Sequence, residues 1–260
     1  MEALIAGKGE IVTDILNFYK NDIFVIAFEG ISEEKLKEFP NVIWLNKIDI
    51  KKVISILKKR NINKVFFIGK FDQRLTFNKI PLNFFTLKLL FSLKDKRPEK
   101  IFEKIKEILK KENIEVIYPK EYIENALVKK EDKIGNFNEN ELENARFGME
   151  IAKFLASKDV GQTVVLKDKV VLAMEAIEGT DETILRASKL TKEDKLTVCK
   201  AARANQSLDF DIPTVGIKTL ETMLKARANT LVLEKNKVLI VNKEKFKEFC
   251  KKHKIKLLPL

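Results

Sequence analysis

Short apolar runs alternate with amphipathic stretches along the first 120 residues. The runs predict strands buried on both faces, and the 3.6-residue periodicity between them predicts helices. The expected strands are residues 3–6, 23–28, 42–44, 65–68 and 115–117. The expected helices are residues 11–21, 33–39, 50–60, 82–91 and 100–111. Strands that alternate with helices in this way predict a Rossmann-like domain with a parallel sheet.

The pattern changes after a polar, irregular stretch at residues 118–140. Beyond it we expect helices at 141–156, 181–187, 218–226 and up to Lys251, hairpins at 163–176 and 231–241, and a strand at 196–199. This order predicts a C-terminal mixed α/β domain. We therefore predict an N-terminal domain at residues 1–130, a linker at 131–140 and a C-terminal domain at 141–260.

The composition of the chain limits the cellular compartment and the classes of binding partner that we expect. The chain has 260 residues, two isolated cysteines and a formal net charge of +12. Unpaired thiols and the lack of a signal-peptide pattern predict a cytoplasmic protein, and no run reaches the roughly 20 apolar residues of a spanning helix. The positive charge favours anionic partners. We expect no nucleic-acid binding, because an aromatic platform, a GXXG loop and paired Cys/His modules are missing.

Two acidic segments, residues 174–181 and 209–216, have the character of an oxygen-ligand site. The first begins where an apolar strand ends and continues into Gly179, Thr180 and Asp181, an order typical of a strand that leads into a helix. In the second, Pro213 favours an extended backbone. Carboxylates at such positions can bind a divalent cation.

The remaining chemistry is limited by what the chain lacks. His253 is the only histidine and lies in a lysine-rich tail, so His-based zinc sites and Ser-His-Asp triads are excluded. Hard-cation chemistry on phosphate fits instead, with Mg²⁺ or Mn²⁺. The candidate ligands are Glu175, Glu178, Asp181, Asp209 and Asp211. Asp211 is favoured, whereas Thr180 and Asp181 also fit as helix caps, and Glu175 and Glu178 are not both expected to be ligands.

The N-terminal loop Gly7, Lys8, Gly9 follows the first strand and precedes a helix. Free amides at a helix N-terminus bind phosphate, so we predict contact with a substrate phosphate there. The third glycine of the dinucleotide motif is replaced by Val12, which disfavours a nicotinamide cofactor.

Several motifs together resemble the LpxI-type UDP-2,3-diacylglucosamine pyrophosphatases. They include residues 4–9, 65–70, 134–135 and 161–162, the run 170–181, Lys200-Ala201-Ala202 and the segment 210–216. The similarity runs over essentially the whole chain.

The resemblance implies a lipid A pathway enzyme that cleaves UDP-2,3-diacylglucosamine to UMP and 2,3-diacylglucosamine 1-phosphate with Mg²⁺. It also implies a cytoplasmic enzyme that is peripheral at the inner membrane, and it leaves room for a homodimer. The functional aspartate of the family matches Asp211. We expect Glu178 and Asp181 to assist it at the metal and Gly7, Lys8, Gly9, Gly179, Thr180 and Thr214 to bind substrate.

The chain departs from the family pattern at Arg203, Ala204, Ser207 and Asp209. These changes concern how phosphate is neutralised near Asp211. Together with the apolar stretch at residues 80–93, which fits either a buried helix or a lipid-facing surface, they leave a second hypothesis open. That alternative is a non-enzymatic lipid or nucleotide carrier.

Overall fold

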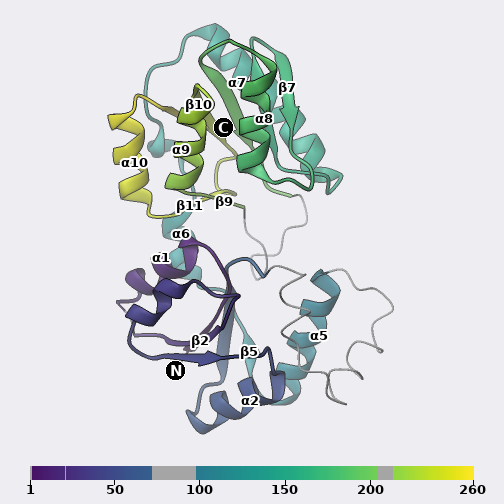
Figure 1. The fold of residues 1–260 in the computed structure, drawn as a ribbon, viewed down its shortest axis with the longest axis vertical. Coiled ribbons are helices and arrows are strands. Elements are labelled where there is room, and N and C mark those ends of the chain that lie inside the picture. The colour runs from purple at the N-terminus through teal and green to yellow at the C-terminus, as the bar shows by residue number, and fades with distance from the viewer. Residues whose placement is uncertain (1, 21, 72–97, 204–212) are drawn as a thin grey trace. The chain divides into compact units, whose positions relative to one another are not determined.

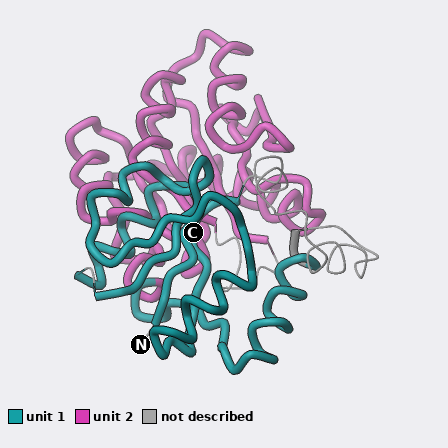
Figure 2. Tube along the Cα trace, turned by 60° about the horizontal axis from the view of Figure 1, so that its bottom comes forward, with its two compact units in different colours: residues 1–122, 207–211 teal, residues 123–206, 212–260 magenta. Residues whose placement is uncertain are grey.

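The computed structural model of the protein describes residues 2–20, 22–71, 98–203 and 213–260 (Figure 1). These residues divide into two compact units, one ending at Tyr122 and the other beginning at Ile123 (Figure 2). The helix predicted at 82–91 and the aspartates Asp209 and Asp211 lie outside the described residues.

The N-terminal unit is built on five parallel strands in the order β3-β2-β1-β4-β5 (Figure 1). The strands are β1 (Glu2–Ala6), β2 (Phe24–Phe28), β3 (Val42–Leu45), β4 (Lys64–Ile68) and β5 (Glu115–Val116). The helices are α1 (Glu10–Phe18), the 3₁₀ helix η1 (Glu34–Glu38), α2 (Ile50–Lys59), α5 (Pro98–Lys111) and α6 (Lys120–Ala126), the last of which crosses the boundary between the units. The parallel, Rossmann-like sheet predicted from the apolar runs is confirmed.

Both faces of this sheet are covered, which explains why its strands are mostly apolar. Side chains of successive strand residues point to opposite faces. The Phe66 ring lies 6.5 Å from that of Tyr19, at the end of α1, whereas the Phe67 ring lies 5.1 Å from Phe102 of α5. Helices α1 and α5 therefore pack on opposite sides.

The C-terminal unit has a mixed five-stranded sheet in the order β12-β10-β8-β6-β7. Its strands are β6 (Thr163–Lys167), β7 (Val170–Met174), β8 (Leu196–Lys200), β10 (Ala228–Leu233) and β12 (Lys256–Pro259), while β9 (Thr214–Val215) and β11 (Leu239–Ile240) form a separate pair. Its helices are η2 (Lys130–Asp132), α7 (Glu139–Ser157), α8 (Thr180–Leu190), α9 (Ile217–Lys225) and α10 (Lys243–Lys252). β6 is antiparallel to both of its neighbours, β7 and β8, whereas β8, β10 and β12 run parallel to one another.

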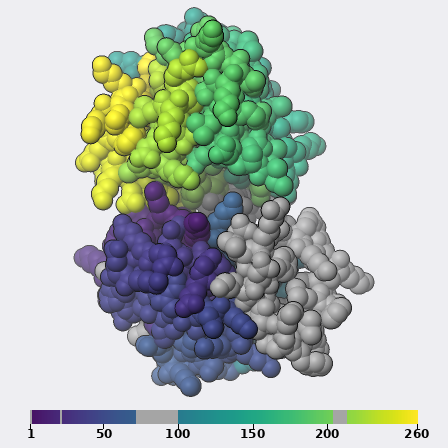
Figure 3. Space-filling model, viewed as in Figure 1, coloured from purple at the N-terminus to yellow at the C-terminus, as the bar shows by residue number. Residues whose placement is uncertain are grey.

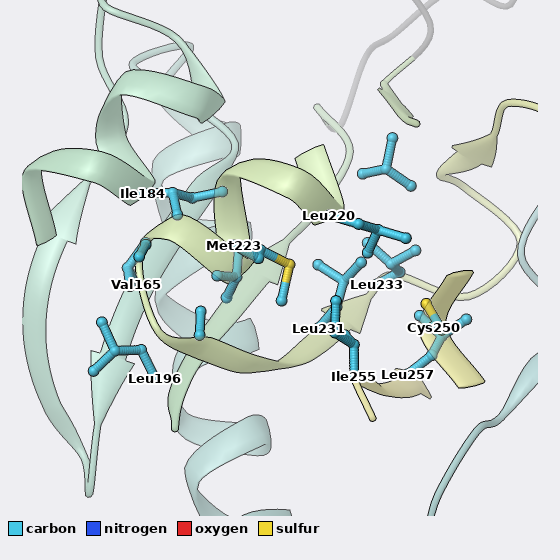
Figure 4. Close-up of a cluster of buried hydrophobic side chains, with 14 of the residues drawn as sticks. Val165, Ile184, Leu196, Leu220, Met223, Leu231, Leu233, Cys250, Ile255 and Leu257 are labelled. Carbon is cyan, nitrogen blue, oxygen red and sulfur yellow. The ribbon is translucent and has the colours of Figure 1, made fainter. Parts of the chain in front are cut away.

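Alternate residues of each strand again serve two cores. Val164 and Leu166 of β6 face a cluster with α7, while Val165, between them, belongs to the cluster with Ile184 of α8 and Met223 of α9 (Figure 4). Helices α8, α9 and α10 cover that second face and form one green-to-yellow surface (Figure 3). The mixed α/β class predicted for this half is confirmed.

One local prediction for this half was wrong, and one strand was missed. The apolar runs of the hairpin predicted at 231–241 belong to different sheets, because β10 pairs with β8 and β12 while β11 pairs with β9. The lysine-rich tail contains β12, which follows α10 and places Leu257 in the core. Periodicity shows that a segment is buried but not which strand it pairs with, and the high lysine content of the tail obscured a four-residue strand.

The predicted linker at 131–140 falls within the C-terminal unit. Val128 donates a backbone hydrogen bond to Val238, and Ile134 exchanges two with Leu257. The boundary that the structure shows comes earlier in the chain because apolar side chains in this polar stretch are buried.

Asp132 ties this segment to α10. Its carboxylate is only 3% exposed and lies 2.7 Å from the Lys243 ammonium and 3.3 Å from that of Lys247. It also accepts a hydrogen bond from the backbone of Lys129. Burial raises the pKa of Asp132, but the hydrogen bonds from Lys243 and Lys129 outweigh burial and leave the pKa below its ordinary value.

We expect Asp132→Asn to lower the free energy of unfolding by about 3 kcal/mol at pH 7, since it leaves a buried lysine without its counter-charge. The pKa of Asp132 is lower in the folded state than in the unfolded state, where it is about 3.9, so the ionised carboxylate stabilises the folded protein above that pH. This stabilisation is lost as the pH falls through the folded-state pKa. The difference between wild type and variant should therefore shrink below about pH 4. Urea unfolding across this pH range measures it. The control is Glu131→Gln at an exposed neighbouring acid, and equal losses in both variants would contradict the assignment.

Candidate functional site

The candidate site of the C-terminal unit lies at one edge of its sheet. Because β6 runs against its neighbours, its first residue lies where β7 and β8 end. Thr163 is the register partner of Lys200, the last residue of β8. Glu175, which follows β7 directly, donates its backbone N–H to the Thr163 carbonyl at 2.8 Å. Three polar side chains distant in sequence are thus adjacent.

These side chains form a chain of hydrogen bonds that runs through Thr180 at the start of α8. The Lys200 ammonium, on a residue that is only 7% exposed, donates to Thr180 Oγ1 at 2.8 Å. The Thr180 hydroxyl donates to Glu175 Oε1 at 3.2 Å, and Thr163 Oγ1 lies 3.2 Å from Thr180 Oγ1. The other carboxylate oxygen of Glu175 accepts from the backbone of Gln162 at 3.3 Å.

Gly161 allows this close approach. A Cβ atom at this position would lie 2.0 Å from the carbonyl oxygen of Glu175, far inside van der Waals contact. Only glycine leaves room for the end of β7 beside the start of β6. The backbone of Glu175 is therefore fixed by packing as well as by its hydrogen bond to Thr163.

Glu178 closes the loop between β7 and α8. Its carboxylate accepts hydrogen bonds from Arg186 at 2.6 Å and from the backbone of Ala176 at 3.2 Å. Arg186 also donates to the Met174 carbonyl. Hydrogen bonds from its own backbone N–H and from Arg186 lower the pKa of Glu178, so this acid is ionised and already has a cationic partner.

Asp181 lies in the first turn of α8, where a negative charge is favoured by the helix dipole. It forms an ion pair with Lys218 of α9 at 3.4 Å. Gly179 precedes the helix at φ +85°, and a Cβ there would meet nothing within 4 Å. Thr214, also predicted to bind substrate, lies in β9, three residues before α9 begins.

The predicted phosphate loop of the N-terminal unit is braced by its own chain. Gly7 donates to the Ile68 carbonyl, and Lys8 exchanges two backbone hydrogen bonds with Lys70. A Cβ at Gly7 would lie 2.8 Å from the backbone of Gly69, so the two loops are in direct contact. The amide of Gly9 donates to a carboxylate oxygen of Glu33 at 2.9 Å. A phosphate at this helix N-terminus would have to replace Glu33.

The described residues do not by themselves assemble a metal centre. No group of three or more His, Cys, Asp or Glu residues in the described ranges could hold an ion. Glu178 and Asp181 are each engaged by a cationic side chain, and Asp211 lies outside the part of the chain that is described. As they stand, these two carboxylates do not fit a metal without a change of partners.

The cysteines are not suited to nucleophilic chemistry. Burial raises the pKa of Cys250 to about 12 and that of Cys199 further, so both thiols stay protonated. None of the helices in the described ranges combines the length and apolar character needed to span a bilayer.

Sequence reasoning did not identify Lys200 and Thr163 as site residues. It included Glu175 among five candidate acids but did not place it in the site. The signal was weak because these residues meet only through the antiparallel register of β6, which the sequence does not specify. The motif positions Gly161 and Lys200 were visible as part of the family resemblance, but without a physical role.

Comparison with known proteins gives consistent matches at the level of family. The model for the LpxI N-terminal domain matches residues 1–126, and that for the LpxI C-terminal domain matches residues 132–258. A curated relative, the UDP-2,3-diacylglucosamine pyrophosphatase LpxI of Caulobacter vibrioides, is 32% identical over 103 residues. That match spans 37% of this chain and 37% of the relative.

Among solved structures, a biotin carboxylase complex from Campylobacter jejuni aligns with 72% of this chain and 41% of its own. The sequence identity is 16% and the TM-score 0.28. A TM-score this low does not support a shared fold.

We expect Gly161→Ala to destabilise the protein by about 2 kcal/mol, because the added methyl group must push apart the ends of β6 and β7. Chemical denaturation measures this change. Val160→Ala is the matched control, since Val160 is half exposed and its truncation should change stability by less than about 0.5 kcal/mol. A Gly161→Ala variant as stable as the control would show that the close approach is not required.

Proposed function

This chain belongs to the LpxI family, and we propose that it hydrolyses the pyrophosphate of UDP-2,3-diacylglucosamine to UMP and 2,3-diacylglucosamine 1-phosphate (lipid X). The observation that supports this most is the succession of both LpxI domains along nearly the whole chain. The activity for which the Caulobacter relative is named points the same way. The reaction belongs to lipid A biosynthesis.

Mg²⁺, or Mn²⁺, is the cofactor that we propose, with Asp211 as its main ligand and the residue most important for activity. When bound, such an ion would neutralise charge on the phosphate oxygens. Glu178 and Asp181 would contribute only by exchanging Arg186 and Lys218 for the ion. Oxygen donors and the lack of a usable histidine support this choice.

We propose substrate-binding residues in each unit, taken by itself. Gly179 and Thr180 offer the N-terminus of α8, where free amides favour an anion, and Thr214 lies in β9. In the N-terminal unit, Gly7, Lys8 and Gly9 would contact a nucleotide phosphate. Of these, the Gly9 amide requires displacement of Glu33.

We further propose a cytoplasmic protein that is peripheral at the inner membrane, where a diacylated substrate would be reached. Ile177 is fully exposed and Met174 is 47% exposed beside the candidate site. Apolar side chains in such a position can contact acyl chains. A homodimer stays a prediction.

Release of UMP from UDP-2,3-diacylglucosamine tests the activity. Purified protein with Mg²⁺ should release UMP, and EDTA should abolish release. We expect Asp211→Ala to lower kcat by about 10²-fold or more, whereas Asp209→Ala, in the same segment but outside the family pattern, serves as the matched control. Equal rates for wild type and Asp211→Ala would remove Asp211 from the mechanism.

No UMP release by any form would contradict the proposed activity. The alternative is then a carrier of lipid or nucleotide, suggested by the apolar stretch at residues 80–93. Native mass spectrometry of freshly purified protein distinguishes the two. Retained lipid without turnover would favour the carrier.

A further inference from the structure

We propose that Glu175 is the acid that orients the attacking water in this hydrolysis, and that Lys200 is a positioning residue that acts on it through Thr180. The inference rests on the proposed function. It assigns a task to the part-buried hydrogen-bond chain that neither the family pattern nor the acidic motif explains.

The donor directions in this chain are fixed by chemistry. A lysine ammonium only donates, so the Thr180 oxygen accepts from Lys200. The single hydroxyl proton of Thr180 is then available for Glu175, which as a carboxylate only accepts. Thr163 must therefore donate its own proton to Thr180. The chain therefore has one direction, from Lys200 to Glu175, and it ends on an acceptor oxygen of Glu175.

Glu175 differs in this respect from the other acids of its segment. Glu178 is neutralised directly by Arg186, and Asp181 is paired with Lys218. The hydrogen bonds to Glu175 among the described residues come from uncharged donors, the Thr180 hydroxyl and the Gln162 backbone. These use one lone pair on each oxygen. Glu175 thus keeps acceptor positions that these hydrogen bonds do not use.

Lys200 supplies the compensating charge without occupying Glu175. A buried ammonium is costly, and an apolar residue would fill the end of β8 more cheaply. The Lys200 ammonium lies one hydroxyl away from Glu175, so the lysine leaves the oxygens of Glu175 accessible. In open α/β sheets, ligands bind at the carboxyl ends of the parallel strands, which is the edge where β8 ends here.

A carboxylate repels phosphate oxygens, so its partner beside a pyrophosphate must be a hydrogen-bond donor. Water meets that requirement. As the water oxygen bonds to phosphorus, the bridging P–O bond breaks and its electron pair stays with the leaving phosphate. The proton of the water passes to Glu175. Glu175→Gln should accordingly lower kcat by about 10²-fold or more.

The positioning role is tested with two variants of one side chain. Thr180→Val keeps the shape but removes the hydroxyl, and we expect kcat to fall by about 10- to 100-fold with KM changed by less than about threefold. Thr180→Ser keeps the hydroxyl and should restore kcat to within about threefold of wild type. If the valine and serine variants turn over equally, the hydrogen-bond chain does not serve catalysis.

Lys200→Met gives an independent test, because methionine replaces the buried stem and removes the charge. It should lower kcat as Thr180→Val does. Since Lys200 is inferred to act through Thr180, the double variant should be no slower than the slower single variant. Multiplied losses would show that Lys200 acts separately and would overturn its positioning role.

A spectroscopic readout separates this inference from the proposed activity. With ¹³C-labelled glutamate at pH 7, the carboxyl resonance of Glu175 is assigned as the one lost in Glu175→Gln. It should shift in Thr180→Val and in Lys200→Met but not in Thr180→Ser. Failure of wild type to release UMP contradicts the proposed function alone. An unshifted resonance, or an active wild type with unimpaired Thr180→Val and Lys200→Met, overturns the inference.

Discussion

The candidate site depends on the direction of one strand. β6 lies antiparallel between β8 and β7, so it begins at the edge where these neighbours end. A parallel β6 would carry Thr163 to the opposite edge. A slip of one residue would turn the paired side chains to opposite faces. The direction and register of β6 therefore place Thr163, Lys200 and Glu175 together, and the position of Gly161 is the steric condition for that register.

The loops at the strand ends differ in their hydrogen-bond partners between the two units, although both units have sheets covered by helices. In the N-terminal unit, backbone groups after β1 and β4 are paired with each other, and Glu33 supplies an internal anion to the start of α1. In the C-terminal unit, α8 begins at Gly179 without a side-chain cap, and the nearby charges are side chains of both signs. The C-terminal unit thus offers groups that can exchange partners, whereas the N-terminal loop is closed by its own contacts.

Much of the architecture could be predicted from the sequence, for physical reasons that also set the limits. Apolar runs such as residues 23–28 and 65–68 predict strands that are buried on both faces, and the parallel sheet was inferred from such runs. Pairing partners could not be predicted, because apolar runs are interchangeable in sequence; the hairpin expected at 231–241 failed for this reason. The acidic segment after β7 was recognised, but Lys200 was not, since its partner Thr180 is 20 residues away and meets it only in the folded sheet.

The acids of this segment differ in how exposed the cationic side chains around them are. Arg186 and Lys218, the partners of Glu178 and Asp181, are 47% and 76% exposed, and ion pairs of such exposure contribute only about 0–1 kcal/mol. They can be replaced by a cation or a phosphate at little cost. The chain from Lys200 to Glu175 is anchored by a buried ammonium and is costly to break. A segment that combines exchangeable acids with one fixed acid can bind a charged group while keeping a water acceptor in place.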